Sequence, residues 1–387
     1  MKIVLISNNT FSEYGGYEKV IHMVLNTFFE SHNCDIKILS LPHYRSLLNK
    51  PILKEFKTFK IDRASDFKNK IHYIFYISCK KFLQRKLNLN IFSLKNFSCE
   101  LIKADIILVT DPLLLVSVKT ILKNYSEPKV VYWDHGSLFG YLRQNLQRLF
   151  YHNEIIEGIK LADAHLCISS EIEEFIKRIS PKALTRIVYN PVPLYTGKLV
   201  DRSSFPTFLY VGRLDDNQKK ISFMLKGLAK LKNKNWKLKI IGTGPDENKL
   251  KNLAKKLKIF DRIEWLGFKK DPFGEITEVT ALLLTSRWEG FPMVLVEANQ
   301  RGIPVISSDC KSGPRDIVIP GVNGYLYKEG DIDEFVKVVN GVIEGNLKFD
   351  SPENIAKTTE RFREDIVIKN IYEFLKSLCK RRIHGTL

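Results

Sequence analysis

Short apolar runs alternate along this chain with longer segments whose apolar residues recur at helical spacing. Six runs in the first half are typical of buried strands, at residues 2–6, 35–39, 106–109, 129–133, 165–168 and 186–189. Six more follow in the second half, at residues 207–211, 237–241, 262–265, 281–285, 304–307 and 324–327. Strands that alternate with helices predict parallel sheets covered by helices on both faces. The expected fold class is therefore α/β.

Two prolines divide this pattern near its middle. Pro191 and Pro193 disfavour helix at the residues before them, so residues 190–197 are interpreted as an interdomain linker. We expect a first domain over residues 1–190 and a second over residues 191–365, because 387 residues are enough for two cores. Residues 366–387 are expected to include a helix that packs back toward the first domain.

Charge and cysteine content narrow the function classes. The formal net charge of +18 should attract an anionic partner. Residues 45–103 hold fourteen Lys or Arg and four Asp or Glu, interleaved with aromatic residues. This pattern is typical of a segment that binds a membrane surface, and it is equally typical of a lysine-rich helix face exposed to water. No apolar run approaches the ~20 residues that span a bilayer. The six cysteines lack paired spacing, which argues against zinc and favours a reducing cytoplasm.

Glycine turns follow two of the expected strands. Gly15 and Gly16 follow the first strand, and Gly242 and Gly244 follow the strand at residues 237–241. Paired glycines allow backbone N–H groups to approach a phosphate at a helix N-terminus. The second turn resembles the start of a dinucleotide fingerprint, but Glu247 occupies the position of its third glycine, which disfavours NAD binding.

Charged residues are also placed at predicted strand ends. Arg213 and Lys219 follow the strand at residues 207–211, and two such cations suit the charge that grows on a departing diphosphate. Glu289 precedes a helix that contains Glu297, and these carboxylates suit sugar hydroxyls. His135 follows the strand at residues 129–133, where a lone histidine is more often structural than catalytic.

Taken together, these residues resemble the retaining glycosyltransferases of family 4. The resemblance rests on the glycine turns, on Arg213 with Lys219, and on Glu289 followed at fixed spacing by Glu297. It implies the GT-B fold, in which two Rossmann-like domains face each other across a cleft. Within the family the chain is similar to bacterial enzymes that extend lipopolysaccharide core or related surface glycans.

The resemblance also implies a reaction and roles for residues. A hexose (galactose, glucose or N-acetylhexosamine) would pass from a UDP-sugar to lipopolysaccharide core, capsule or another lipid-linked glycan, with release of UDP. Arg213 and Lys219 would bind the diphosphate, Glu289 the donor sugar and Glu297 the ribose, while His135 would lie beside the transferred sugar. Further donor contacts would come from Gly16, Gly242, Gly244, Phe291, Pro292 and Met293. Lys219 is preferred to Lys220 because the family places Gly or Arg after this lysine.

No metal or other cofactor is expected. The one Asp-x-Asp triplet, Asp331 to Asp333, lies beyond the nucleotide motifs and is interpreted as a helix N-cap. The expected location is the cytoplasm or the inner face of its membrane, without a nucleic-acid partner. Two alternatives stay open at this point: a non-enzymatic basic protein that binds nucleic acid or another anion, and a nicotinamide-dependent oxidoreductase.

Overall fold

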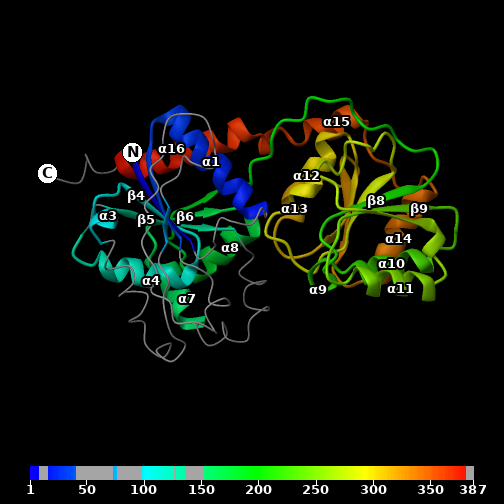
Figure 1. Cartoon of the computed structure of the whole chain (residues 1–387), viewed down its shortest axis with the longest axis horizontal. Coiled ribbons are helices and arrows are strands. Elements are labelled where there is room, and N and C mark those ends of the chain that lie inside the picture. Colours follow the sequence, from blue (N-terminus) through cyan, green and yellow to red (C-terminus); the bar gives the residue numbers. More distant parts are fainter. Residues whose placement is uncertain (8–15, 41–72, 76–97, 126–127, 136–151, 381–387) are drawn as a thin grey trace. The chain divides into compact units, whose positions relative to one another are not determined.

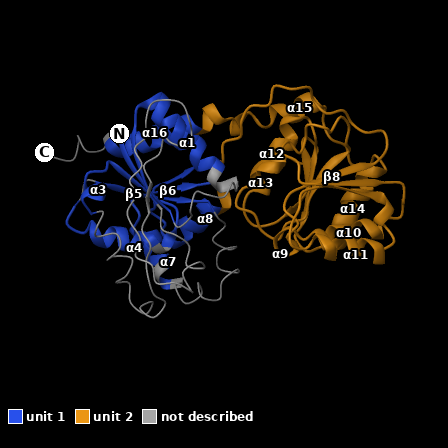
Figure 2. Ribbon diagram, viewed as in Figure 1, with its two compact units in different colours: residues 1–168, 172–188, 368–387 blue, residues 169–171, 189–367 orange. Residues whose placement is uncertain are grey.

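The structure is a computed structural model, which describes residues 1–7, 16–40, 73–75, 98–125, 128–135 and 152–380 (Figure 1). The chain divides into two compact units, coloured separately in Figure 2. The first unit comprises Met1–Ile168, Ile172–Val188 and Ile368–Leu387. The second comprises Ser169–Glu171 and Tyr189–Val367. Each unit is built on its own parallel sheet.

The sheet of the first unit has seven parallel strands in the order β3-β2-β1-β4-β5-β6-β7. Its strands are β1 (Lys2–Ser7), β2 (Asp35–Ser40), β3 (Tyr73–Phe75), β4 (Ile106–Val109), β5 (Lys129–Asp134), β6 (Ala164–Cys167) and β7 (Thr185–Ile187). The central strand β1 pairs on both sides, with Leu5 opposite Ile38 on β2 and Leu108 on β4. Continuous apolar runs fit this position because such strands are covered on both faces.

Helices lie on both faces of this sheet (Figure 1). They are α1 (Gly16–His32), α3 (Ser98–Ile102), α4 (Pro112–Ile121), α7 (His152–Leu161) and α8 (Ser170–Ile179), together with α16 (Glu364–Lys380) from the chain's far end. The Tyr372 ring of α16 stacks on His32 of α1 at 3.7 Å and meets Phe28 edge-on at 5.7 Å. Most of α16 therefore belongs to the first unit although it follows the second in sequence.

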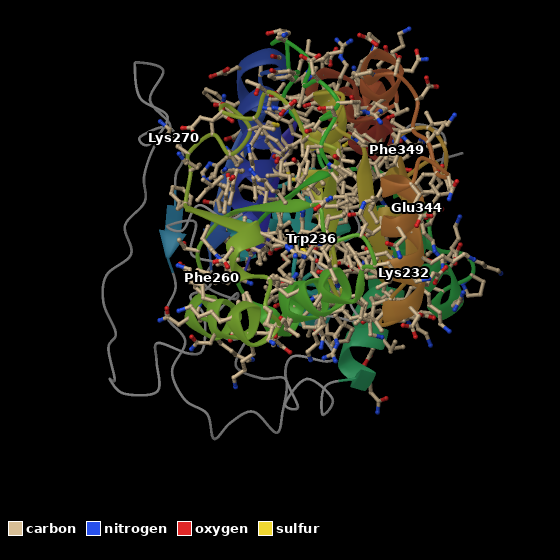
Figure 3. The ribbon with its side chains drawn as sticks, turned by 90° about the vertical axis from the view of Figure 1, so that its right-hand side faces the viewer. Lys232, Trp236, Phe260, Lys270, Glu344 and Phe349 are labelled. Carbon is tan, nitrogen blue, oxygen red and sulfur yellow. The ribbon has the colours of Figure 1, made fainter. Side chains whose placement is uncertain are left out.

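The sheet of the second unit has six parallel strands in the order β10-β9-β8-β11-β12-β13. These are β8 (Thr207–Val211), β9 (Lys237–Ile241), β10 (Ile263–Gly267), β11 (Ala281–Leu284), β12 (Val305–Asp309) and β13 (Gly324–Lys328). Its helices are α9 (Asp216–Lys219), α10 (Ile221–Lys230), α11 (Glu247–Lys256), α12 (Met293–Gln300), α13 (Pro314–Ile317), α14 (Ile332–Ile343) and α15 (Pro352–Lys357), with short 3₁₀ turns at Phe260–Arg262 and Glu360–Phe362. Between the sheet and α10, α11 and α14 lies a core that includes Trp236 (labelled in Figure 3), Tyr210 and Phe335.

All twelve expected strands are present, and three of them, β4, β8 and β9, have the expected bounds. The sequence analysis missed β3, which pairs with β2 through Ile74 opposite Leu39. Three residues within a lysine-rich segment are too few to give a strand pattern.

Of residues 45–103, only 73–75 and 98–103 are described, so the expectation of a membrane-binding surface lies outside the described residues. No helix of the described parts is long and apolar enough to cross a membrane.

A buried histidine on β6 gives the first unit a predictable response to acid. His165 is 1% exposed, and burial lowers its pKa to about 4. Below pH 6.5 the unfolded chain binds a proton that the folded chain does not bind, so the free energy of unfolding falls as the pH is lowered. Between pH 7 and pH 5, His165 should contribute a loss of about 2 kcal/mol.

The measurement is urea unfolding of the parent and His165→Gln at pH 7 and pH 5. Carboxyl groups and the other histidines titrate in both proteins, so the difference between the two pH responses isolates His165. The variant should lose less stability on acidification. Equal losses in the two proteins would contradict a neutral, buried His165.

Candidate active site

Three glycines lie together at the carboxyl edge of the second sheet. The N–H of Gly212, after β8, donates to the Ile241 carbonyl at 3.0 Å, and the N–H of Gly242, after β9, donates to the Gly267 carbonyl at 2.7 Å. A Cβ on Gly242 would lie 1.9 Å from the Gly212 carbonyl oxygen, and φ of Gly242 is +140°. Only glycine fits there. The two backbones form a surface without side chains at the edge where ligands bind in open α/β sheets.

The turns that follow these glycines are joined to each other. The Leu214 N–H donates to the Thr243 carbonyl at 2.9 Å, and the Asp246 N–H donates to the Leu214 carbonyl at 3.1 Å. A Cβ on Gly244 would lie 2.4 Å from that same carbonyl. Gly244 therefore allows two loops to pack at backbone distance. The sequence analysis identified the glycines but not this close approach.

Arg213 is held at this edge with its guanidinium exposed. Its Nη2 lies 3.1 Å from Asp215 Oδ2 and 3.3 Å from Gln218 Oε1, and its side chain is 62% exposed. The Tyr210 hydroxyl donates to the Arg213 carbonyl at 2.9 Å and fixes the backbone. An exposed guanidinium over a fixed backbone can exchange a carboxylate partner for a phosphate.

Lys219 and Glu289 form an ion pair. Lys219 Nζ lies 2.7 Å from Glu289 Oε1, and the two side chains are 18% and 7% exposed. The Ser286 hydroxyl donates to the same carboxylate oxygen at 2.5 Å. Two residues that the sequence analysis assigned to different parts of a donor are therefore in direct contact.

The local backbone explains why Lys219, and not Lys220, faces Glu289. Lys219 is the last residue of α9, whose N-cap Asp215 accepts from the Asn217 and Gln218 N–H groups. Lys220 then adopts the left-handed conformation at φ 53°, which turns the chain into α10. The Thr285 hydroxyl spans this turn at 2.9 Å from the Lys219 carbonyl and 3.1 Å from the Lys220 carbonyl. The turn thus aims the Lys219 side chain.

The loop from Glu289 to Pro292 leads into α12. Pro292 is the N-cap of this helix, and Glu297 lies half-buried one turn inside it. The Glu289 N–H donates to the Lys311 carbonyl at 3.3 Å, and the Ser312 hydroxyl donates to the Gly290 carbonyl at 2.8 Å. The loop is thus held in front of the N-terminus of α12, whose helix dipole favours anions.

Two predicted site residues belong to the first unit, and each follows a strand. Gly16 is the first residue of the 17-residue helix α1, after β1. His135 follows β5, its ring lies 4.4 Å from that of Trp133, and burial lowers its pKa to about 3. His135 is therefore neutral near pH 7 and suits a hydroxyl partner better than it suits a phosphate.

The sequence analysis missed Phe268. This residue directly follows β10 and Gly267, whose carbonyl accepts from Gly242. Phe268 is 75% exposed, the highest value among the large apolar side chains that the structure describes. Phe268 could have been identified from the sequence, because it comes soon after a predicted strand, as Arg213 and Gly242 do. The carboxyl edge thus carries an exposed aromatic ring beside a glycine turn.

The described residues contain no group of three His, Cys, Asp or Glu side chains that could hold a metal ion. In the Asp-x-Asp triplet, the Asp331 carboxylate accepts from the Glu334 N–H at 3.0 Å as the N-cap of α14. Asp333 forms an ion pair with Lys230 at 2.9 Å. The expected N-cap role of Asp331 is confirmed.

Comparison with known proteins agrees with this arrangement. The family described as "Glycosyl transferases group 1" matches residues 196–362. The lipopolysaccharide 1,6-galactosyltransferase of Salmonella typhimurium is 37% identical over 96% of this chain and 97% of its own length. Its Escherichia coli counterpart is 36% identical over 72% of this chain and 76% of its own length.

Solved structures show the same fold. The lipopolysaccharide outer core galactosyltransferase WaaB, solved in its apo form, has a TM-score of 0.80 with 34% identity, over 97% of this chain and 99% of that chain. The Anabaena protein HepE, solved with UDP, has a TM-score of 0.72 with 18% identity, over 97% of this chain and 100% of that chain. The GT-B fold with two Rossmann-like domains is thus confirmed, and neither the nucleic-acid-binding nor the oxidoreductase alternative accounts for these relatives. This chain belongs to the group 1 glycosyl transferases and is a sugar-transferring enzyme.

Proposed function

We propose that this enzyme transfers a hexose from a UDP-sugar to a bacterial surface glycan and retains the configuration at the anomeric carbon. The observation that carries the proposal is the carboxyl edge of the second sheet, where Arg213, the Lys219–Glu289 pair and the start of α12 accompany a surface of glycine backbone. Support for the acceptor class comes from the Salmonella relative, which matches along nearly its whole length. Support for the donor comes from HepE, a protein of the same fold that binds UDP.

The proposed reaction uses these residues to stabilise the leaving group. An acceptor hydroxyl attacks the anomeric carbon on the face from which UDP departs. The bond between that carbon and the diphosphate oxygen breaks, and a phosphate oxygen of UDP takes the hydroxyl proton. Arg213, Lys219 and the N–H groups of α12 stabilise the negative charge that develops on UDP, so the step needs no metal ion. Glu289 and Glu297 accept hydrogen bonds from the donor sugar and the ribose.

Lys219 would have two partners during this cycle. Without the donor it pairs with Glu289, and this pairing offsets the cost of burying both charges. When the donor binds, the diphosphate would compete for Lys219, and Glu289 would become available to the sugar hydroxyls. His135 and Gly16 of the first unit would contact the transferred sugar and the diphosphate.

We further propose a cytoplasmic enzyme whose basic residues 45–103 attract an anionic, membrane-held acceptor.

The donor class is tested by thermal unfolding with UDP, GDP and NAD. A ligand that binds only the folded state raises the melting temperature, by mass action equivalent to about 2.7 kcal/mol at 100 times its Kd. UDP should raise the melting temperature of the second unit more than GDP or NAD does. Equal increases of the melting temperature with UDP and GDP would contradict the proposal that the site prefers a uracil base.

A separate prediction concerns Phe268 as a surface on which the uracil base stacks. Stacking of a base on an aromatic ring contributes ~1 to 3 kcal/mol in measurements by alanine substitution. Phe268→Ala should therefore weaken UDP binding by about tenfold in calorimetry. Phe205 is a suitable control because it is 42% exposed and precedes β8, at the opposite edge of the sheet. A similar loss in Phe205→Ala, or no loss in Phe268→Ala, would contradict the stacking.

A further inference from the structure

Three aromatic rings from distant parts of the sequence meet behind the loop before α12. The Phe291 ring lies 5.6 Å from Tyr189 and 5.5 Å from Phe362, and the Tyr189 and Phe362 rings are 5.0 Å apart. Phe291 is 7% exposed and Phe362 is fully buried. Each ring therefore contacts the other two, and we call Tyr189, Phe291 and Phe362 the ring triad.

A cation and backbone contacts hold the triad in place. The Arg361 guanidinium carbon lies 4.7 Å from the centre of the Phe362 ring and 5.7 Å from that of Tyr189. Arg361 also donates to the Asp316 carbonyl, and the Val192 N–H donates to the Phe362 carbonyl at 2.9 Å. Cation–π contacts of this kind contribute about 0.5 to 2 kcal/mol each. The two outer rings are thus fixed independently of Phe291.

The triad joins the site loop to two of the places where the chain passes between the units. Tyr189 is the first residue of the second unit after Val188 of the first. Phe362 lies just before Ile368, where the chain re-enters the first unit. These two connections therefore meet at the Phe291 side chain.

Phe291 is also part of the backbone proposed to hold the donor. Its carbonyl accepts from the Met293 N–H at 2.9 Å, and the neighbouring Gly290 carbonyl accepts from the Ser312 hydroxyl. By contrast, α12 itself is fixed by the buried residues Leu295, Val296 and Ala298. A loss of ring packing at Phe291 should therefore disturb residues 290–293 and leave Glu297 in place.

We propose that Tyr189 and Phe362 are positioning residues of the donor site. They hold the ring of Phe291, and through it the backbone of residues 290–293, in the conformation that receives the diphosphate and sugar of the donor. The inference rests on the proposed function for the identity of the donor. It assigns a role to residues that lie near two of the connections between the units and outside residues 289–297.

The test compares Tyr189→Leu and Tyr189→Phe with the parent. Leucine keeps most of the buried volume but removes the ring, whereas phenylalanine keeps the ring and removes only the hydroxyl. Tyr325→Leu is the matched control, because Tyr325 is also half-buried and its ring lies 5.4 Å from that of Phe349. Phe349 (labelled in Figure 3) likewise lies under a guanidinium, that of Arg202, at 5.1 Å.

Calorimetry with UDP-galactose, UDP and UMP supplies the readout, because UMP has neither the β-phosphate nor the sugar. Tyr189→Leu should bind UDP-galactose and UDP about tenfold more weakly and bind UMP as the parent does, since small misplacements of a site are costly. Tyr189→Phe and Tyr325→Leu should match the parent with all three ligands. The ratio of UDP to UMP affinity is internal to each folded protein, so a general loss of stability does not mimic this result.

Two outcomes would overturn the inference in different ways. An unchanged ratio of UDP to UMP affinity in Tyr189→Leu, with UDP bound by the parent, would contradict the positioning role alone. Failure of the parent to bind any of the three nucleotides would contradict the proposed function, and the inference with it.

Discussion

Lys219→Ala is expected to lower kcat/KM by about 10²- to 10³-fold. One preorganised hydrogen-bond donor that faces the negative charge formed in the transition state typically contributes this much to the rate. The same substitution leaves Glu289, with its 7% exposed side chain, without its cation. An unpaired buried carboxylate is costly, so the free energy of unfolding should fall as well. Steady-state kinetics with saturating acceptor and urea unfolding measure the two effects.

The adjacent lysine is the natural control for this substitution. Lys220 is in the left-handed conformation, which costs ~1 to 2 kcal/mol for a residue with a Cβ. Lys220→Gly relieves this strain, keeps the turn that aims Lys219, and should retain nearly full activity. If Lys220→Gly were inactive and Lys219→Ala active, the assignment of the two lysines would be reversed.

Gly242→Ala is the second change with a large expected effect. The new Cβ would meet the Gly212 carbonyl oxygen at 1.9 Å, and both partners are backbone at the ends of paired strands, so neither can move freely. With the strain of φ +140°, the expected cost is about 3 to 5 kcal/mol of unfolding free energy. UDP binding should be lost together with this stability, because the surface of glycine backbone would be filled.

A second glycine separates steric overlap from backbone strain. Gly330 also has a positive φ, +82°, but a Cβ there meets nothing within 4 Å. Gly330→Ala should therefore cost only about 1 kcal/mol and leave UDP binding unchanged. Equal destabilisation by the two substitutions in urea unfolding would show that the close approach of Gly242 to Gly212 does not matter.

The sequence predicted the fold wherever a strand stands out against its surroundings. The apolar run of residues 207–211 ends at Gly212, and the run of residues 106–109 ends before a polar Thr-Asp pair, so the ends of these strands could be predicted. Strand β3 could not be predicted, because Tyr73–Phe75 is too short to show an alternating or continuous apolar pattern. The placement of Arg213, Lys219 and Glu289 at strand ends followed from the general geometry of parallel sheets.

Contacts between distant segments lay beyond the sequence. Residues 219 and 289 are 70 positions apart, and only the folded chain shows that they pair. The left-handed turn at Lys220 was also hidden, since lysine rarely adopts it and the Thr285 hydroxyl that spans it comes from another strand end. The ring triad depends on three segments, and the segments of Tyr189 and Phe362 carry no recognisable motif. The roles of the predicted site residues stay predictions until the substitutions are made.

The most direct test of the central claim is product analysis with a panel of UDP-hexoses and truncated lipopolysaccharide core oligosaccharides as acceptors. The account predicts that one acceptor gains a single hexose in the presence of EDTA, seen by mass spectrometry. It also predicts that nuclear magnetic resonance shows the new linkage in the anomeric configuration of the donor, and that Lys219→Ala gives little product. Transfer that stops in EDTA and returns with manganese, a product of inverted configuration, or no transfer from any UDP-hexose would contradict it.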